Sequence, residues 1–259
     1  MLLSSGDLSI DLGPMWVFFL VAARLIALFH LLPGIGTDQV PEQFRYYLLI
    51  LISAVCAYSL PAQKMPEELH EIVLSLASEF TLGIILSLFP SMIIGGMTMA
   101  GQIIAGVIGL GQANLIDRSL GESVSVLAKF NSFLGTLIFL GINGHHVILK
   151  AATTNIGQLV LGRGFSLERS VNLLTVCFTS SFELAIVLTA PILIATLISQ
   201  FLLGLITKFV PQVNIFIISL PLSIFMGFYI ISFTMEPLTE NVVDRFSVLE
   251  EYTGAVFLK

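Results

Sequence analysis

The sequence predicts an all-α protein of the integral membrane type, and its composition and patterning lead to that prediction. Of the 259 residues, 56% are hydrophobic and 11% are charged, which is about half the charged fraction of a typical soluble domain. The net charge of −6, with no run of lysines and arginines, argues against nucleic acid as a partner. The apolar residues gather into six stretches of helical length. These stretches cover residues 15–32, 44–60, 69–100, 126–149, 176–206 and 213–235.

Two of these stretches are too long for one straight membrane crossing. A crossing needs about 20 residues, and the third and fifth stretches are considerably longer. Each contains a proline, Pro90 or Pro191, and an internal proline removes a backbone hydrogen bond and clashes with the preceding turn. We therefore expect broken or kinked helices, or helical hairpins, and Pro221 interrupts the last stretch in the same way.

The helices are expected to pack as a single compact unit with polar connections near 61–68, 112–125 and 150–172. The segment from Glu236 onward is acidic, and we expect it to be a solvated tail. No lysine or arginine precedes the first apolar stretch, so the N-terminus lacks the basic region of a secretory signal. The first helix is therefore expected to remain in the protein.

A glycine-rich segment at 95–111 is the most unusual part of the chain. It reads GGMTMAGQIIAGVIGLG and contains no charge, and each glycine inside a helix costs about 1 kcal/mol relative to alanine. Gly101, Ala105 and Gly109 recur at four-residue spacing, a stripe of small residues that lets helices approach closely. The remaining glycines favour a flexible, tightly packed loop at a constriction.

Signatures of enzymes and metal sites are missing from the sequence. His70 and Glu71 begin like a zinc-protease helix, but Leu74 stands where the second histidine is needed. His145 and His146 are adjacent, and adjacent helical side chains diverge, so we expect them to cap or pack rather than to bind metal. Cys56 and Cys177 lie in separate apolar segments and are expected to be small buried side chains. We expect no catalytic activity, no cofactor and no metal.

Among the ionisable side chains in the apolar stretches, four are the most informative, namely Arg24, Glu79, Lys129 and Glu183. A charge at the centre of a bilayer costs at least about 2.5 kcal/mol, so such side chains normally face a partner or a water-filled space. Lys129 lies near the end of its stretch and can reach the interface. For Arg24 and Glu183 two interpretations are open: an internal salt bridge that holds helices together, or a polar pore or subunit contact.

Six motifs in order along nearly the whole chain resemble one known family. They are RLIALFHLLPGIGTDQVPEQFR at 24–45, EFTLG at 79–83, AGQIIAGVIGLGQANLID at 100–117, NGHH at 143–146, FELAIVLTAP at 182–191 and LLGLITKFVPQVNIFIISLP at 202–221. Together they resemble the FliR family of type III export-gate subunits, whose virulence counterparts are the SctT proteins. The most specific motif is P-Q-x-N-x-F at 211–216. Lys208 stands where the family more often has arginine, and Arg118 where proline is usual.

This resemblance implies a non-enzymatic subunit of a helical hetero-oligomeric channel in the bacterial inner membrane, at the flagellar basal body. The expected partners are FliP-like and FliQ-like subunits, FlhB- and FlhA-like export proteins, and unfolded protein substrates. The chain would be a single export-gate subunit, with a FliP-like part at about 1–175 and a FliQ-like helical pair and tail at about 176–259. The family also implies that a loop corresponding to 102–122 plugs the pore.

A plug has to exclude water when closed and to withdraw when a polypeptide passes. An α-helix with its side chains is about 10–12 Å wide, so apolar residues and mobile glycines suit both states. The candidate plug residues are Gly106, Ile108, Gly109, Leu110, Gly111, Leu115 and Asp117. The candidate subunit contacts or buried charges are Arg24, Glu79, Glu183, Lys208, Pro211, Gln212 and Asn214.

Three alternatives to a flagellar gate remain open from the sequence. An ion-coupled secondary transporter would suit the prolines within helices and the intramembrane carboxylates, but it also predicts related halves, and no internal similarity is evident. An injectisome counterpart of the same gate differs in the exported proteins, although NGHH and PQVNIF favour the flagellar form. A plain assembly scaffold would lack the plug.

Overall fold

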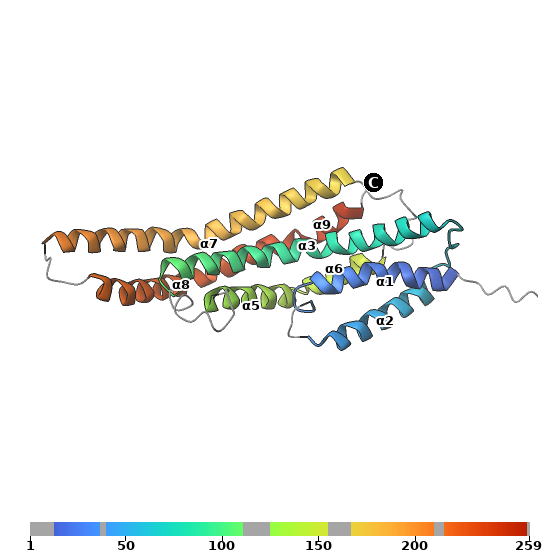
Figure 1. Cartoon of the computed structure of the whole chain (residues 1–259), viewed down its shortest axis with the longest axis horizontal. Helices are drawn as coiled ribbons and strands as arrows, with labels where there is room; N and C mark the ends of the chain where they lie inside the picture. Colours follow the sequence, from blue (N-terminus) through green and yellow to red (C-terminus); the bar gives the residue numbers. More distant parts are fainter. Residues whose placement is uncertain (1–12, 37–39, 111–124, 155–166, 210–214, 258–259) are drawn as a thin grey trace, which may run out of the picture. The chain divides into compact units, whose positions relative to one another are not determined.

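The computed structural model describes residues 13–36, 40–110, 125–154, 167–209 and 215–257, which are helical apart from short connections. The predicted all-α fold is confirmed for this part of the chain (Figure 1). The helices are α1 (Gly13–Leu31), α2 (Glu42–Ser59), α3 (Leu69–Val107), α5 (Val126–Gly141), α6 (Gly144–Thr154), α7 (Leu167–Phe209), α8 (Ile215–Ser247) and α9 (Leu249–Phe257).

The long apolar stretches form continuous helices that contain their prolines. α3 passes through Pro90 and α7 through Pro191, while α8 contains both Pro221 and Pro237. A backbone in apolar surroundings must keep its remaining hydrogen bonds, so a helix there bends at proline rather than ending. α7 changes direction along its length in Figure 1. Neither α3 nor α7 is itself a hairpin. Of the alternatives expected for the two long stretches, the structure therefore shows the continuous, kinked helix.

α7 and α8 together form an antiparallel helical pair. Residues 210–214 join the two helices, and Glu183 of α7 contacts Arg245 near the far end of α8. This contact requires the helices to run in opposite directions. The fold therefore does contain a helical hairpin, built from two consecutive long helices.

The stretch at 126–149 is divided into α5 and α6 by a bend at Ile142 and Asn143. Asn143 has a φ of 60°, a left-handed conformation that asparagine tolerates better than most residues. A Cβ added at Gly144 would lie 2.5 Å from the ring of Phe139. The Asn-Gly pair of the NGHH motif is therefore explained by backbone conformation and by close packing.

The C-terminal segment differs from the expected tail. Its acidic side chains Glu236, Glu240 and Asp244 are exposed, as expected, but the backbone is helical and one face is packed. Within unit 2, defined below, the ring of Phe246 lies 5.4 Å from Phe139. The helical face is explained by buried residues at spacings of four, four and three, which are Leu238, Val242, Phe246 and Leu249.

Contacts divide the chain into two compact units instead of the single unit expected. Unit 1 comprises Met1–Ser87, His146–Ser170 and Thr253–Lys259, and unit 2 comprises Leu88–His145 and Val171–Tyr252. α3 contributes its first half to unit 1 and its second half to unit 2. The boundary expected near residue 175 separates a part that resembles one kind of subunit from a part that resembles another. The division into compact units does not test this resemblance, so the boundary stays a prediction.

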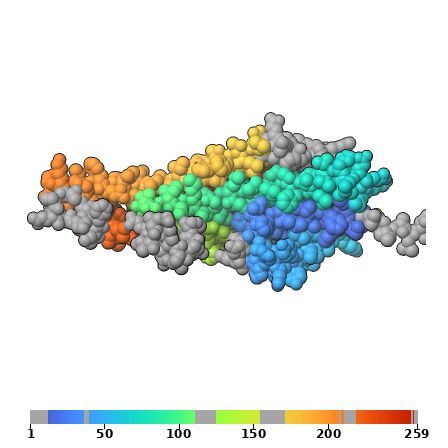
Figure 2. Space-filling model, in the orientation of Figure 1, coloured from blue at the N-terminus to red at the C-terminus, as the bar shows by residue number. Residues whose placement is uncertain are grey.

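Unit 1 is built around α1, which packs lengthwise against α2 (Figures 1 and 2). Side chains on most sides of α1 are buried, including those of Trp16, Leu20 and Leu25. The first half of α3 approaches α1 closely, because a Cβ added at Gly83 would overlap the carbonyl oxygen of Arg24. Only glycine permits this backbone contact.

Among the described residues, four helices are long and apolar enough to cross a membrane. They are α1, α3, residues 171–206 of α7, and a segment of 218–254 that continues past α8; the bent pair α5–α6 is a possible fifth. α2 is not among them, because its first turns carry Glu42, Gln43 and Arg45. The apolar composition and these helices identify a membrane protein.

Replacing Gly83 tests the close approach of α3 to α1. We expect Gly83→Ala to destabilise the protein by about 1–3 kcal/mol through overpacking, which lowers Tm by several degrees. Gly95→Ala on the same helix is the matched control, because a Cβ there meets nothing within 4 Å. The control is expected to leave Tm unchanged or to raise it. Equal Tm values for the two variants in detergent, measured by circular dichroism, would contradict the packing role of Gly83.

Candidate functional site

The second half of α3 packs its backbone directly against two other helices of unit 2. A Cβ at Gly96 would lie 2.5 Å from the carbonyl oxygen of Ser181 in α7, and one at Gly101 would lie 2.6 Å from the Cα of Ala128 in α5. By contrast, Gly95 and Gly106 are exposed and a Cβ at either would meet nothing within 4 Å. α3 therefore has one closely packed glycine face and one open glycine face.

The expected stripe of small residues is only partly a packing device. Gly101 makes the close contact with α5, and Ala105 is buried in a cluster with Ile104, Leu127 and Ile192. Gly109 lies beyond the end of α3 and has a φ of +89°, a backbone conformation that side-chain-bearing residues rarely adopt. Its role is thus to end the helix by a turn and not to pack it.

Ile108 anchors the end of α3 in the core of unit 2. Its side chain is fully buried in the cluster that contains Ile104 and Leu127, and Leu110 packs against the same cluster. A Cβ added at Gly227 of α8 would overlap Ile108. The side chain of Ile108 therefore fits here only because residue 227 is a glycine. Within this chain the side chain of Ile108 thus holds a helix end, and its expected part in the plug stays a prediction. The sequence could not reveal this, because glycines surround the residue on both sides.

Polar contacts join α3 to the start of α5. The backbone N–H of Ser125 donates to Oε1 of Gln102 at 3.0 Å, and the N–H of Ala128 donates to Oγ of Ser125 at 3.2 Å. Ser125 is therefore the N-cap of α5. Further along, Nδ2 of Asn131 donates to the carbonyl oxygen of Met97 at 3.3 Å. We refer to these contacts and the Gly101–Ala128 approach as the α3–α5 stem.

The sequence interpretation missed the stem, although signals for it existed. A serine directly before an apolar helical run is a typical N-cap, and Asn131 is a polar residue inside an apolar stretch. Other expected site residues lie outside the described part of the chain. These are Gly111, Leu115 and Asp117 of the proposed plug, and Pro211, Gln212 and Asn214 of the most specific motif. Lys208 is exposed in the last turn of α7.

Arg24 and Glu79 form a buried ion pair in unit 1. Nε of Arg24 donates to Oε2 of Glu79 at 2.7 Å, and Nη1 donates to the carbonyl oxygen of Ala152 in α6 at 2.9 Å. Both side chains are almost completely buried. Glu79 lies one helical turn before Gly83, so the same face of α3 receives both the guanidinium and the backbone of Arg24. The ion pair thus joins α1, α3 and α6.

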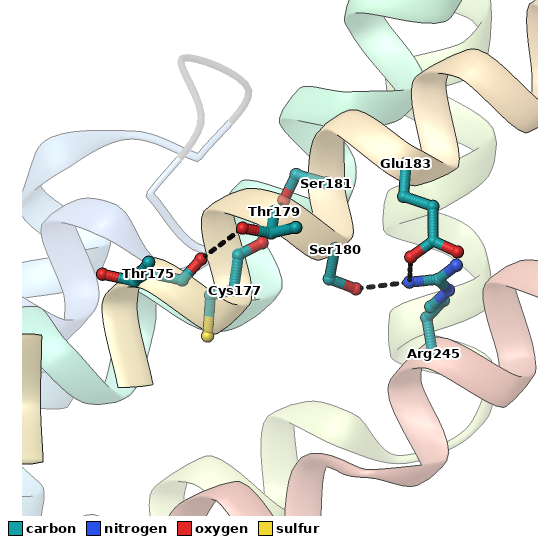
Figure 3. Close-up of polar contacts among 7 residues, drawn as sticks. All are labelled: Thr175, Cys177, Thr179, Ser180, Ser181, Glu183 and Arg245. Atoms are coloured by element: carbon teal, nitrogen blue, oxygen red, sulfur yellow. Dashed lines mark hydrogen bonds and ion pairs between the residues drawn. The ribbon is translucent and has the colours of Figure 1, made fainter. Parts of the chain in front are cut away.

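Glu183 is paired within unit 2, with Arg245 of α8 (Figure 3). Nη1 of Arg245 donates to Oε2 of Glu183 at 3.1 Å and to Oγ of Ser180 at 2.7 Å. This pair is partly exposed, with 61% of the Glu183 side chain accessible. Of the two open interpretations, the internal salt bridge is therefore present for both Arg24 and Glu183. Their role in a pore or subunit contact stays a prediction.

Metal and thiol chemistry find little support in the described part of the chain. Within those ranges no three histidine, cysteine or carboxylate side chains are grouped to hold a metal ion. Cys56 and Cys177 are both free thiols, and Cys177 is buried. Burial raises the pKa of the Cys56 thiol above its ordinary value, which lowers its reactivity near neutral pH.

The buried ion pair gives a testable difference from the exposed one. Glu79→Leu leaves the Arg24 guanidinium buried without its carboxylate and is expected to destabilise the protein by about 3–5 kcal/mol. Glu183→Gln removes an exposed partner and is expected to cost about 1 kcal/mol or less.

A double variant distinguishes lost pairing from lost packing. Arg24→Met combined with Glu79→Leu removes both charges, so it is expected to be more stable than Glu79→Leu alone. Thermal unfolding in detergent measures all four proteins. A double variant less stable than Glu79→Leu alone would show that the loss of the ion pair does not explain the destabilisation.

Comparison with known proteins gives consistent similarities over most of the chain. The family described as bacterial export proteins, family 1, matches residues 15–249. The chain is 26% identical over 245 residues to the flagellar biosynthetic protein FliR of Bacillus subtilis (strain 168), covering 93% of this chain and 94% of the relative. It is 27% identical over 212 residues to FliR of Escherichia coli (strain K12), covering 82% and 81%.

A relative with a different name is similar at the same level. The chain is 27% identical over 217 residues to the surface presentation of antigens protein SpaR of Shigella flexneri, covering 83% of this chain and 82% of the relative. The names of these relatives refer to flagellar biosynthesis and to surface presentation of antigens, and the family description concerns export. None of these names describes an enzyme, in agreement with the expectation from the sequence.

Proposed function

The chain belongs to the family of bacterial export proteins, family 1, and from this premise we propose that it is a subunit of a flagellar type III export gate. It forms part of the entrance of a channel through which unfolded proteins cross the bacterial inner membrane at the flagellar basal body. Its neighbours are FliP-like and FliQ-like subunits, with FlhB- and FlhA-like proteins as further partners. The flagellar form is favoured over the injectisome form by the NGHH and PQVNIF motifs. Identity and coverage do not separate the two forms, because FliR of Escherichia coli and SpaR are matched equally well.

The observation that carries this proposal is the large apolar surface that the chain leaves uncovered. In the most apolar part of α1, 56% of the residues are buried within the chain. The corresponding buried share is 33% in α7 and 11% in the segment at 218–254. Large side chains such as Phe201, Phe225 and Phe233 are exposed. Contiguous apolar surface of this extent normally contacts lipid or other subunits. A subunit of a helical channel has both kinds of neighbour.

The plug mechanism is supported by the way in which its flanks are held. On one side Ile108 fixes the end of α3 in the core, and Gly109 turns the chain. On the other side Ser125 begins α5, and Gln102 ties that start back to α3. We propose that the segment between these flanks, with Gly111, Leu115 and Asp117, closes the pore. Rigid flanks would let it withdraw without disturbing the helices.

The rival transporter function finds less support. A coupling site needs a carboxylate that exchanges its ion or proton during the cycle. Glu79 is held by Arg24 in a fully buried pair, and Glu183 is held by Arg245. Both carboxylates are therefore engaged in holding helices together.

A deletion of residues 111–117 tests the plug. It leaves Ile108 and the Gln102–Ser125 contact in place, so the α3–α5 stem should still form. We expect the assembled gate to leak ions, which is measured as a severalfold increase in membrane conductance of cells that produce it.

The control replaces the same residues by a glycine-serine segment of equal length. Because it keeps the length but removes the apolar side chains, it is expected to leak as well, which assigns the closure to those side chains. Unchanged conductance in a gate that co-purifies with its usual partners would contradict the plug.

A further inference from the structure

The outward face of α8 in unit 2 carries a ladder of exposed aromatic rings. Phe225, Tyr229 and Phe233 follow one another at four-residue spacing, so they lie on one side of the helix. The ring centroids are 6.3 Å apart in the first pair and 4.9 Å apart in the second, and each residue is more than half exposed. Because the rings support one another, a docking partner immobilises little further side-chain freedom. Exposed aromatic surface of this kind is typical of the centre of a protein interface.

The same face of α8 continues as a row of carboxylates. The row begins three residues after Phe233 and consists of Glu236, Glu240 and Asp244, all of them exposed. None of these carboxylates forms an ion pair with a residue that the structure describes. The neighbouring cation on α8, Arg245, is engaged with α7 instead. We refer to the aromatic ladder and the carboxylate row together as the α8 face.

The carboxylate row lowers the stability of the isolated chain. Like charges four residues apart on a helix repel each other. Asp244 also lies in the last turn of α8, where the helix dipole is itself negative. A neighbour with positive charges opposite the row would replace this repulsion by attraction. An anionic membrane surface would not, because its own charge is negative. Charge complementarity therefore favours a basic protein segment as the occupant of the α8 face.

We propose that the α8 face docks a helix of a neighbouring gate subunit, with an apolar stretch that is followed by lysines or arginines at spacings of three and four residues. The apolar stretch packs on the aromatic ladder, and the cations pair with the carboxylate row. From Phe225 to Asp244 the face is about 28 Å long, so the docked helix has about 20 residues. This inference rests on the proposed function, because it names the chemistry of a partner within the gate.

The two halves of the α8 face contribute differently to docking. Burial of the three rings supplies most of the affinity, because aromatic side chains carry a large apolar area. Exposed ion pairs add little affinity each. Their effect is on the choice and register of the partner, because a helix with an acidic or misplaced segment would meet repulsion at the carboxylate row.

Docking can be measured with the full chain, purified from membranes of the cells that produce it. The FliP-like and FliQ-like subunits that it retains are quantified by mass spectrometry over a series of salt concentrations. The combined substitution of Glu236→Gln, Glu240→Gln and Asp244→Asn is expected to weaken retention of one subunit about tenfold at low salt, the factor that three exposed ion pairs supply together. The remaining retention should no longer depend on salt.

Two further variants separate the halves of the face. Tyr229→Ser is expected to weaken retention about tenfold or more at every salt concentration, because it removes the centre of the ladder. The matched control combines Glu67→Gln, Glu68→Gln and Glu71→Gln, which removes the same charge from an exposed part of unit 1 and is expected to change nothing. Circular dichroism verifies that each variant is folded.

Three results would overturn the proposal. They are undiminished retention of every subunit by the folded carboxylate variant, retention by the unaltered protein that does not depend on salt, and native masses that show only lipid or a second copy of this chain released by Tyr229→Ser. In each case the unaltered protein can still retain its FliP-like and FliQ-like partners, so the export function stands. If the unaltered protein retains neither partner, both proposals fail.

Discussion

Close approach of the α3 backbone to its neighbours is the constraint on which the rest of the structure depends. Glycines permit this approach in both units: Gly83 meets α1 in unit 1, and Gly96 and Gly101 meet α7 and α5 in unit 2. In an apolar protein, burial alone hardly determines which helices pair, because nearly every helix surface is apolar. Dispersion contacts and short hydrogen bonds do determine it, and both require the helices to lie close together. The free energy that glycine costs a helix is offset by the packing that it allows.

The few charges of the chain are used at these close crossings. Arg24 can reach both Glu79 and the carbonyl of Ala152 because Gly83 lets α3 and α1 touch. In unit 2, polar bonds between α3 and α5 flank the contact of Gly101 with Ala128. Paired and hydrogen-bonded groups of this kind avoid the cost of isolated polar atoms in apolar surroundings. The proposed plug depends on this rigidity at its flanks.

Local features of the fold were predictable from the sequence, and pairings were not. Long apolar stretches predicted the helices, and the glycine spacing predicted a close crossing at Gly101, because both are properties of consecutive residues. The partner of Arg24 lies 55 residues away, a separation at which periodicity carries no information. The packed face of the C-terminal helices was missed because acidic residues between the buried positions suggested solvation. The burial of Ile108 depends on Gly227 of α8 and was equally hidden.

The central claim is that this close-packed chain is one subunit of a multi-subunit export gate and not a self-contained transporter. Native mass spectrometry of the protein, purified gently from membranes of the cells that produce it, tests this claim most directly. The account predicts a complex of fixed stoichiometry that contains one copy of this chain together with FliP-like and FliQ-like subunits. A homogeneous protein without these partners, showing ion-dependent solute uptake after reconstitution, would contradict it.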